Sequence, residues 1–142
     1  MPFREKTSWV TLAAMIVAYG VYFAVLANAA QAGPPPVTQM LVLFAGVTIA
    51  QVVAIAIAST VLAIQARGDA RARADERDRA IARRSANVAY YVLMIEMILV
   101  GVVMPFSEPG WKIINAALLS LVIAEAVRYI LTILSYRRGW HG

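Results

Sequence analysis

The sequence predicts an all-α fold, an integral membrane bundle of four helices with the N- and C-termini in the cytoplasm. An apolar composition and four long apolar stretches predict the fold, and the distribution of basic residues predicts the orientation. Of the 142 residues, 61% are hydrophobic and 15% are charged, and the mean hydropathy is +0.70. Soluble domains contain about 45–50% apolar and about 25% charged residues, so this composition is too apolar for one small water-soluble core.

Four apolar stretches are long enough to cross a bilayer, which takes about 20 residues of helix. Lipid offers no hydrogen-bond partner to an open backbone, so each stretch is expected to be helical. The spans are predicted at about residues 9–30, 37–65, 86–105 and 112–136. They form a single membrane domain over residues 1–142, and the charged segment 66–85 is the longest connection. The first span exceeds the usual signal-peptide core of about 7–15 apolar residues, so we interpret it as a retained helix.

Basic residues are distributed unevenly between the two sides of the predicted bundle. The segment 66–85 carries seven arginines, and with four spans it falls on the same side as both chain ends. The chain ends add Arg4, Lys6, Arg137 and Arg138. The opposite side has only Lys112. Because cytoplasmic loops carry the excess of Lys and Arg, the charged segment and both termini are predicted to be cytoplasmic.

The charged segment has a core of five consecutive ionisable residues: Asp75, Glu76, Arg77, Asp78 and Arg79. Asp69 is a candidate N-cap, and acid–base pairs at helical spacing predict a helix that starts near 69–74 and continues into the third span. On this helix Asp75, Asp78 and Arg79 are expected to share one face. The segment 69–84 is either a docking surface for a cytoplasmic protein or a solvated extension whose charges satisfy one another.

Metal, nucleic-acid and catalytic roles are not expected. Arg77 and Arg79 neutralise the acidic side chains that a hard cation would need. The segment has no interleaved aromatic residue and no Gly-rich phosphate loop, so direct nucleic-acid binding is not expected. The chain has no cysteine and a single histidine, His141, and no Ser/His/Asp set is evident. We therefore expect no enzymatic activity and no cofactor.

Three ionisable residues fall inside the predicted spans, where charges are costly and usually face the bundle interior. Glu96 lies near mid-depth in the third span, and Glu125 and Arg128 lie in the fourth. Because these spans are antiparallel neighbours, the three side chains are expected to form a buried cluster, to which Gln51 and Asn115 add hydrogen bonds. Two carboxylates face one guanidinium, so the cluster is a structural polar contact, a proton, ion or substrate site, or a sensor of a membrane signal.

Three short motifs resemble those of small, uncharacterised bacterial membrane proteins with four helices. They are Phe3-Arg4-Glu5-Lys6-Thr7, Asp75-Glu76-Arg77-Asp78 and Tyr136-Arg137-Arg138-Gly139. The resemblance implies a multi-pass protein of the bacterial inner membrane that binds a small helix-turn-helix regulator, with the contact at the Asp-Glu-Arg-Asp motif. It implies no biochemical activity.

Two functions therefore remain. The first is a non-enzymatic regulatory or interaction protein that binds a cytoplasmic partner through residues 69–84. The alternative is a small oligomeric transporter or proton-coupled channel that uses the buried Glu96, Glu125 and Arg128 cluster. Small residues such as Ala14 and Ala18 at i,i+4 spacing allow close helix contact, and a homodimer is the favoured oligomer.

Overall fold

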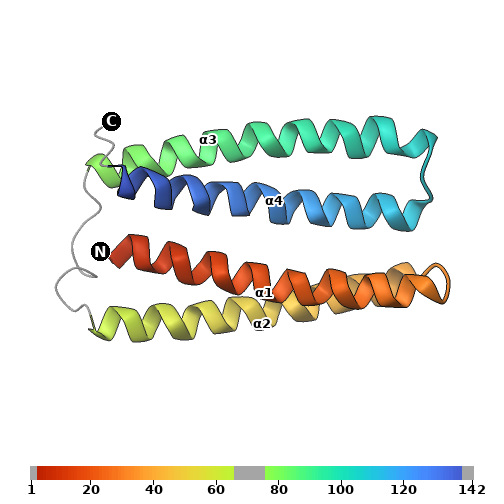
Figure 1. The fold of residues 1–142 in the computed structure, drawn as a ribbon, viewed down its shortest axis with the longest axis horizontal. Coiled ribbons are helices and arrows are strands. Elements are labelled where there is room, and N and C mark those ends of the chain that lie inside the picture. Colours follow the sequence, from red (N-terminus) through yellow and green to blue (C-terminus); the bar gives the residue numbers. More distant parts are fainter. Residues whose placement is uncertain (1–2, 66–75, 139–142) are drawn as a thin grey trace.

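The structure, a computed structural model, describes residues 3–65 and 76–138 as an all-helical protein (Figure 1). Its four long helices are α1 (Phe3–Gln31), α2 (Val37–Gln65), α3 (Glu76–Ile98) and α4 (Gly110–Arg137). All four are long and apolar enough to cross a membrane, so the predicted all-α membrane fold is confirmed and its apolar surface contacts lipid. The expected N-cap Asp69 and helix start at 69–74 lie outside the described residues.

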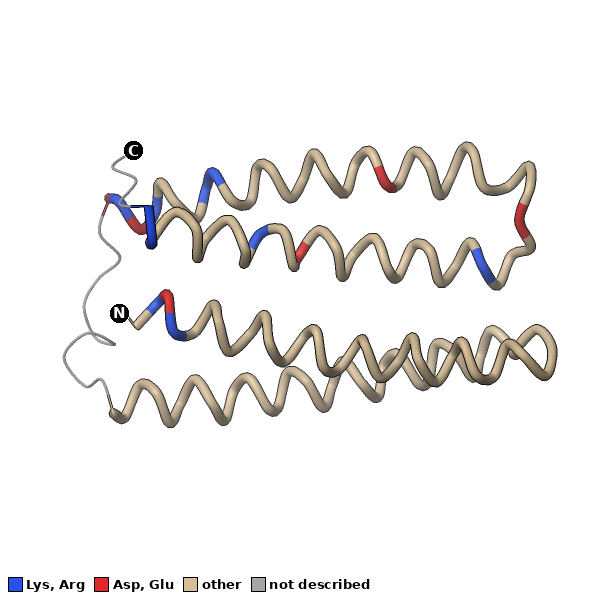
Figure 2. The backbone as a smooth tube through the Cα atoms, viewed as in Figure 1, with Lys and Arg blue, Asp and Glu red and all other residues tan. Residues whose placement is uncertain are grey.

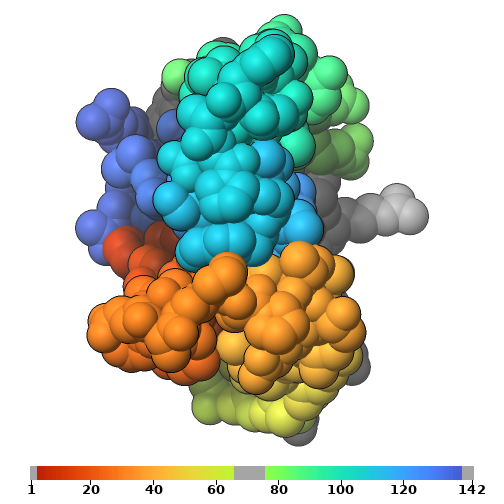
Figure 3. All heavy atoms as spheres, turned by 90° about the vertical axis from the view of Figure 1, so that its right-hand side faces the viewer, coloured from red at the N-terminus to blue at the C-terminus, as the bar shows by residue number. Residues whose placement is uncertain are grey.

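The helices form two antiparallel hairpins, α1 with α2 and α3 with α4, joined mainly through contact between α1 and α4. Figure 3 looks along the helices and shows the α3–α4 hairpin above the α1–α2 hairpin. The starts of α1 and α3 and the ends of α2 and α4 lie at one end, which Figure 2 shows to hold most of the charged residues. We call this the charged end and the opposite one the hairpin end.

Proline and glycine define the two tight connections at the hairpin end. After α1, Gly33 adopts a φ of +136°, a backbone conformation that favours glycine. Pro34, Pro35 and Pro36 then carry the chain to α2, whose first turn begins with a hydrogen bond from the Met40 amide to the Pro36 carbonyl at 3.2 Å. In the second hairpin, Pro109 is the N-cap of α4.

α3 changes its winding before it ends. A π-helical turn covers Leu99–Val103 and a short 3-10 turn covers Met104–Phe106. Pro105 has no amide hydrogen, so the carbonyl four residues before it lacks its α-helical donor. Just before the proline, the Met104 amide donates to the Leu99 carbonyl five residues back, and not to the carbonyl four residues back as in an α-helix. The third membrane-crossing helix therefore ends at the proline that closes the predicted span.

Buried residues of α1 form one narrow seam with alternating spacings of three and four residues. The seam consists of Glu5, Ser8, Leu12, Met15, Tyr19, Tyr22 and Leu26, with Thr11 beside it. This spacing keeps the buried side chains on one side of a helix that packs against its neighbours as in a coiled coil. The seam is polar at the charged end and apolar at the hairpin end.

A polar contact inside an aromatic core joins three helices near the hairpin end. Tyr22 is fully buried, and its hydroxyl donates to Asn115 Oδ1 at 2.6 Å. The Asn115 amide nitrogen lies 2.8 Å from the Met40 sulfur, and Phe44 packs edge-on against Tyr22 with ring centroids 5.2 Å apart. Asn115 thus makes hydrogen bonds, as expected, but with α1 and α2 and not with a charged cluster.

The outer helices α2 and α3 are buried little in the single chain. α2 buries only Met40 and Gln51, and α3 buries Ile81, Ser85 and Ala89 near the charged end. On α1, Gly20 is exposed and has no atom within 4 Å of the position of a Cβ. The remaining helix surface is open to lipid or to another chain, and the homodimer stays a prediction.

Candidate functional site

The charged end brings the three motifs of the sequence together. Asp78, in the first turn of α3, forms an ion pair with Arg4 of α1, in which Nε of Arg4 lies 3.0 Å from Oδ2 of Asp78. The other carboxylate oxygen of Asp78 accepts the hydroxyl of Tyr136 from α4 at 2.6 Å. One side chain therefore connects three helices, and its own exposed fraction is 21%. We call Arg4, Asp78 and Tyr136 the charged-end contact.

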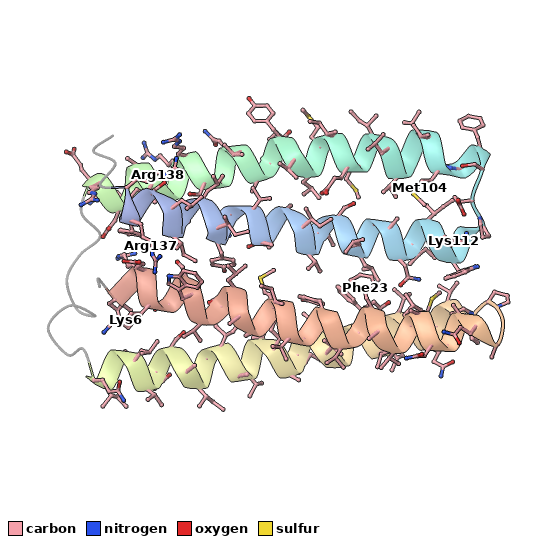
Figure 4. The ribbon with its side chains drawn as sticks, viewed as in Figure 1. Lys6, Phe23, Met104, Lys112, Arg137 and Arg138 are labelled. Atoms are coloured by element: carbon pink, nitrogen blue, oxygen red, sulfur yellow. The ribbon has the colours of Figure 1, made fainter. Side chains whose placement is uncertain are left out.

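A second polar contact ties the start of α1 to the end of α4. The Glu5 side chain is only 6% exposed, and its Oε1 lies 3.6 Å from Nε of Arg137. The Arg137 guanidinium also sits 5.3 Å from the ring centroid of Trp9, close enough for a cation–π interaction. Figure 4 shows Arg137 pointing from α4 toward the first turns of α1.

The first turns of α3 have two distinct faces. Ile81, Ser85 and Ala89 are spaced four residues apart and face the bundle. Asp78 lies with them, because it is three residues before Ile81 and contacts α1 and α4. The opposite face exposes Glu76, Arg79 and Arg83, and we call these three residues the outer α3 face.

This division changes the surface proposed from the sequence. Asp78 and Arg79 were expected on one face, but Asp78 turns inward and Arg79 is exposed. The 100° step between consecutive helical residues separates them, and the partners Arg4 and Tyr136 fix which of the two is inside. Arg77 lies between the two faces and is half-buried. Asp75 lies outside the described residues.

The expected cluster of Glu96, Glu125 and Arg128 does not form, and this prediction is wrong. Arg128 Nη1 lies 3.4 Å from both carboxylate oxygens of Glu125. Glu96 Oε2 is buried without a hydrogen-bond partner among the described residues. The Glu125 and Arg128 side chains are also 47% and 46% exposed, so the pair is not buried in the single chain.

Orientation around the helix axis explains why the cluster fails. Antiparallel neighbours place Glu96 and Glu125 at similar depths, but depth does not fix which way a side chain points. Glu125 and Arg128 line cavities together with Thr11 of α1 and Ile55 of α2. These two side chains of α4 therefore face the α1–α2 hairpin. Glu96 lies on α3, the helix that pairs with α4 in the same hairpin.

Two adjoining cavities form a central groove between the hairpins. The one nearer the charged end has a volume of about 440 Å³, and the deeper one has about 370 Å³. Thr11, Ile55 and Tyr129 line both, so the two are adjacent. The first contains Arg4, Asp78 and Arg128 in its wall, and the second contains Glu125 and Gln51.

The groove offers hydrogen-bond acceptors and charge but no metal centre. Across residues 3–65 and 76–138, no group of three or more His, Cys, Asp or Glu side chains is placed to hold a metal ion. Gln51 is 9% exposed, and its Oε1 has no hydrogen-bond partner. The polar groups that line the groove are therefore the side chains of separate helices and not a preformed metal site.

Sequence reasoning did not assign Arg4, Glu5, Tyr136 and Arg137 to the site. It used Arg4 and Arg137 as signals of orientation, and it named Glu5 and Tyr136 as members of the resemblance motifs. The signal that pointed to them was the set of three resemblance motifs. Arg4 and Glu5 belong to the first motif, Asp78 to the second, and Tyr136 and Arg137 to the third. Four spans bring those motifs to one side of the membrane, where opposite charges on neighbouring helices can pair.

A family model described as "Predicted membrane protein (DUF2178)" matches residues 4–140 of the chain. This match spans all four helices and confirms the expected kind of family, one of small membrane proteins without an assigned activity. Neither the curated proteins nor the solved structures contain a significant match.

The charged-end contact is expected to stabilise the packing of α3 on α1. Asp78→Ala removes an ion pair and a hydrogen bond and leaves the hydroxyl of Tyr136 without its acceptor. We expect the free energy of unfolding in detergent micelles to fall by about 1–2 kcal/mol. Denaturant titration followed by circular dichroism measures the change.

The matched control is Arg83→Ala, which removes an exposed charge on the outer α3 face and is expected to change stability by less than about 0.5 kcal/mol. The effects of Asp78→Ala and Arg4→Met are expected to be non-additive, because the two residues are in contact. Equal losses from Asp78→Ala and Arg83→Ala would contradict the assignment.

Proposed function

We propose that this chain, which belongs to the family of predicted membrane proteins matched above, is a non-enzymatic inner-membrane protein that binds a cytoplasmic regulatory protein. The proposed contact surface is the outer α3 face, Glu76, Arg79 and Arg83. One observation carries the proposal: Asp78 anchors the first turn of α3 to α1 and α4. A polar helix end held in this way presents its opposite face in a fixed orientation.

The charge distribution supports a cytoplasmic position for this surface. Lys and Arg gather at the charged end (Figure 2), and in the described part of the chain the hairpin end holds Lys112, near the start of α4 (Figure 4). Cytoplasmic ends of membrane helices carry such an excess of basic residues. With this orientation the outer α3 face meets soluble proteins of the cytoplasm.

The chemistry of the surface favours a charged protein partner. Arginine side chains form directional hydrogen bonds with carboxylates, and Glu76, about one turn before Arg79, adds one site of opposite sign. Charge complementarity of this kind selects partners and speeds their encounter. A small helix-turn-helix regulator, the partner implied by the sequence resemblance, is the candidate.

Single cysteines test the orientation, because the natural chain contains none. Ser107→Cys lies at the hairpin end and Arg84→Cys at the charged end. In intact spheroplasts a membrane-impermeant maleimide is expected to label Ser107→Cys, and to label Arg84→Cys only after lysis. The reverse pattern would contradict the proposed orientation.

Partner capture tests the outer α3 face. Arg79→Ala/Arg83→Ala keeps five of the seven arginines of segment 66–85, so the orientation signal survives. Capture is measured by a pull-down from native membranes in mild detergent, quantified by mass spectrometry. We expect the double variant to capture about tenfold less of a soluble protein that the wild type binds.

The control for capture is Lys112→Ala, which removes an exposed basic side chain at the hairpin end. This variant should capture the partner as well as the wild type does. If the double variant captures as much as the wild type, the outer α3 face is not the contact. If the wild type captures no soluble protein, the proposed function is wrong.

A second candidate function is proton-coupled transport, supported by the ion pair of Glu125 and Arg128 in the central groove. Ionisable residues within membrane spans commonly mark ion and proton pathways. In liposomes with an internal pH dye, Glu125→Gln is expected to abolish pH-linked flux, and Glu108→Gln, at the hairpin end, to retain it. Absence of flux from the wild type would exclude this function.

A further inference from the structure

The deeper cavity of the central groove combines aromatic rings with polar acceptors. It lies between α1, α2 and α4 and has a volume of about 370 Å³. Its aromatic lining is Tyr19, Phe44 and Tyr129, and the first two rings stack with centroids 5.3 Å apart. Cavities of this size, with a mostly apolar wall and a few polar groups, are typical of small-molecule sites.

The cavity has one acidic side chain in its wall. Among its described lining residues, Glu125 is the ionisable acid and no Lys or Arg occurs. Arg128 lines the neighbouring cavity and contacts Glu125 from there, at 3.4 Å to each oxygen. Close charge-assisted hydrogen bonds are about 2.7–2.9 Å long, so the carboxylate retains capacity for a second donor.

Gln51 supplies an acceptor that has no donor among the described residues. The residue is 9% exposed, and its Oε1 is covered by neighbouring atoms and makes no hydrogen bond. The other polar pair in the wall is satisfied internally, because the Tyr19 hydroxyl and Thr48 Oγ1 are 3.2 Å apart. A buried acceptor without a donor costs free energy. A change of rotamer that turns Oε1 into the cavity would let a ligand N–H group remove that cost.

We propose that this cavity binds a hydrophobic organic cation that carries an N–H donor. The cationic nitrogen contacts the Glu125 carboxylate and, once the Gln51 side chain turns its covered Oε1 into the cavity, donates to that oxygen. The apolar substituent of the ligand packs against Tyr19, Phe44 and Tyr129. Aromatic faces attract cations, so the rings favour the charged form of the ligand. The site goes beyond partner binding at the outer α3 face, because binding in the cavity requires no protein partner.

The same wall disfavours other occupants. An anion would meet a carboxylate and an unpaired carbonyl oxygen. A hard metal ion needs about six oxygen ligands, and a single carboxylate supplies too few. A lipid chain would fill the apolar part but leave Gln51 Oε1 without a donor. Thr11, Ile55 and Tyr129 line both cavities, so the site adjoins the cavity nearer the charged end.

Three related probes separate the contributions of charge and hydrogen bonding. They are 1-naphthylmethylammonium, its N,N,N-trimethyl analogue and the neutral 1-naphthalenemethanol. Binding to the full chain in neutral maltoside detergent is measured by isothermal titration calorimetry. We expect the primary ammonium to bind at least about tenfold more tightly than the alcohol, and the trimethyl analogue, which has no N–H group, to bind between them.

Two variants assign the contacts to residues. Glu125→Gln is expected to weaken binding of the primary ammonium about tenfold, to the level of the alcohol. Gln51→Leu is expected to reduce, by about threefold or more, the preference for the primary ammonium over its trimethyl analogue, because Glu125 still accepts from the N–H groups. The matched control is Glu108→Gln, which neutralises an acid that pairs with Lys112 at the hairpin end and should leave binding unchanged.

Several results would overturn the proposal. One is equal affinity of the wild type for the ammonium and the alcohol, which is also the result expected if the probe only replaces a lipid chain. Another is wild-type affinity in Glu125→Gln. A third is the absence of saturable binding of the primary ammonium to the wild type at probe concentrations below about 1 mM. If Glu125→Gln does not fold, the selectivity of Gln51→Leu decides. None of these results bears on partner capture, which the outer α3 face variants test.

Discussion

The contact between α1 and α4 holds the two hairpins together, and the rest of the structure depends on it. Inside a bilayer, burial of apolar surface gives little drive for helices to associate, because lipid is as apolar as the side chains. Polar contacts therefore decide which helices meet. Here they lie near the two ends of the interface: Tyr22 with Asn115 near the hairpin end, and Arg4, Asp78 and Tyr136 at the charged end.

The middle of the same interface is less tightly closed. Between the two polar contacts the hairpins separate enough to leave the central groove, with Glu125, Arg128 and Gln51 in its wall. A single transmembrane hydrogen bond contributes on average about 0.6 kcal/mol, so contacts at both ends are needed to hold helices around an opening. The charged-end contact itself lines the first cavity, so the groove begins at that contact and extends toward the middle of the helices.

Two surfaces with different chemistry result. The outer α3 face is charged and exposed, and it suits a protein partner. The deeper cavity is aromatic with one carboxylate, and it suits a small cation. Both are built on α4: Tyr136 fixes the start of α3 through Asp78, and Glu125 lies about three turns earlier on the same helix. Movement of α4 relative to α1 would therefore change both surfaces together.

The sequence by itself determined the class and the number of helices, because the cost of exposing backbone groups to lipid leaves few alternatives. The predicted second span, 37–65, coincides with α2, since Pro36 precedes it and the chain turns polar at Gln65. Tertiary structure alone decided the site. Spacing indicated the Glu125–Arg128 pair, three residues apart on one helix, but the separation of Glu96 from that pair depends on rotation about α4. Likewise, Asp78 faces inward because Arg4 and Tyr136 come from helices far away in the sequence, and no local pattern records which distant side chains will meet.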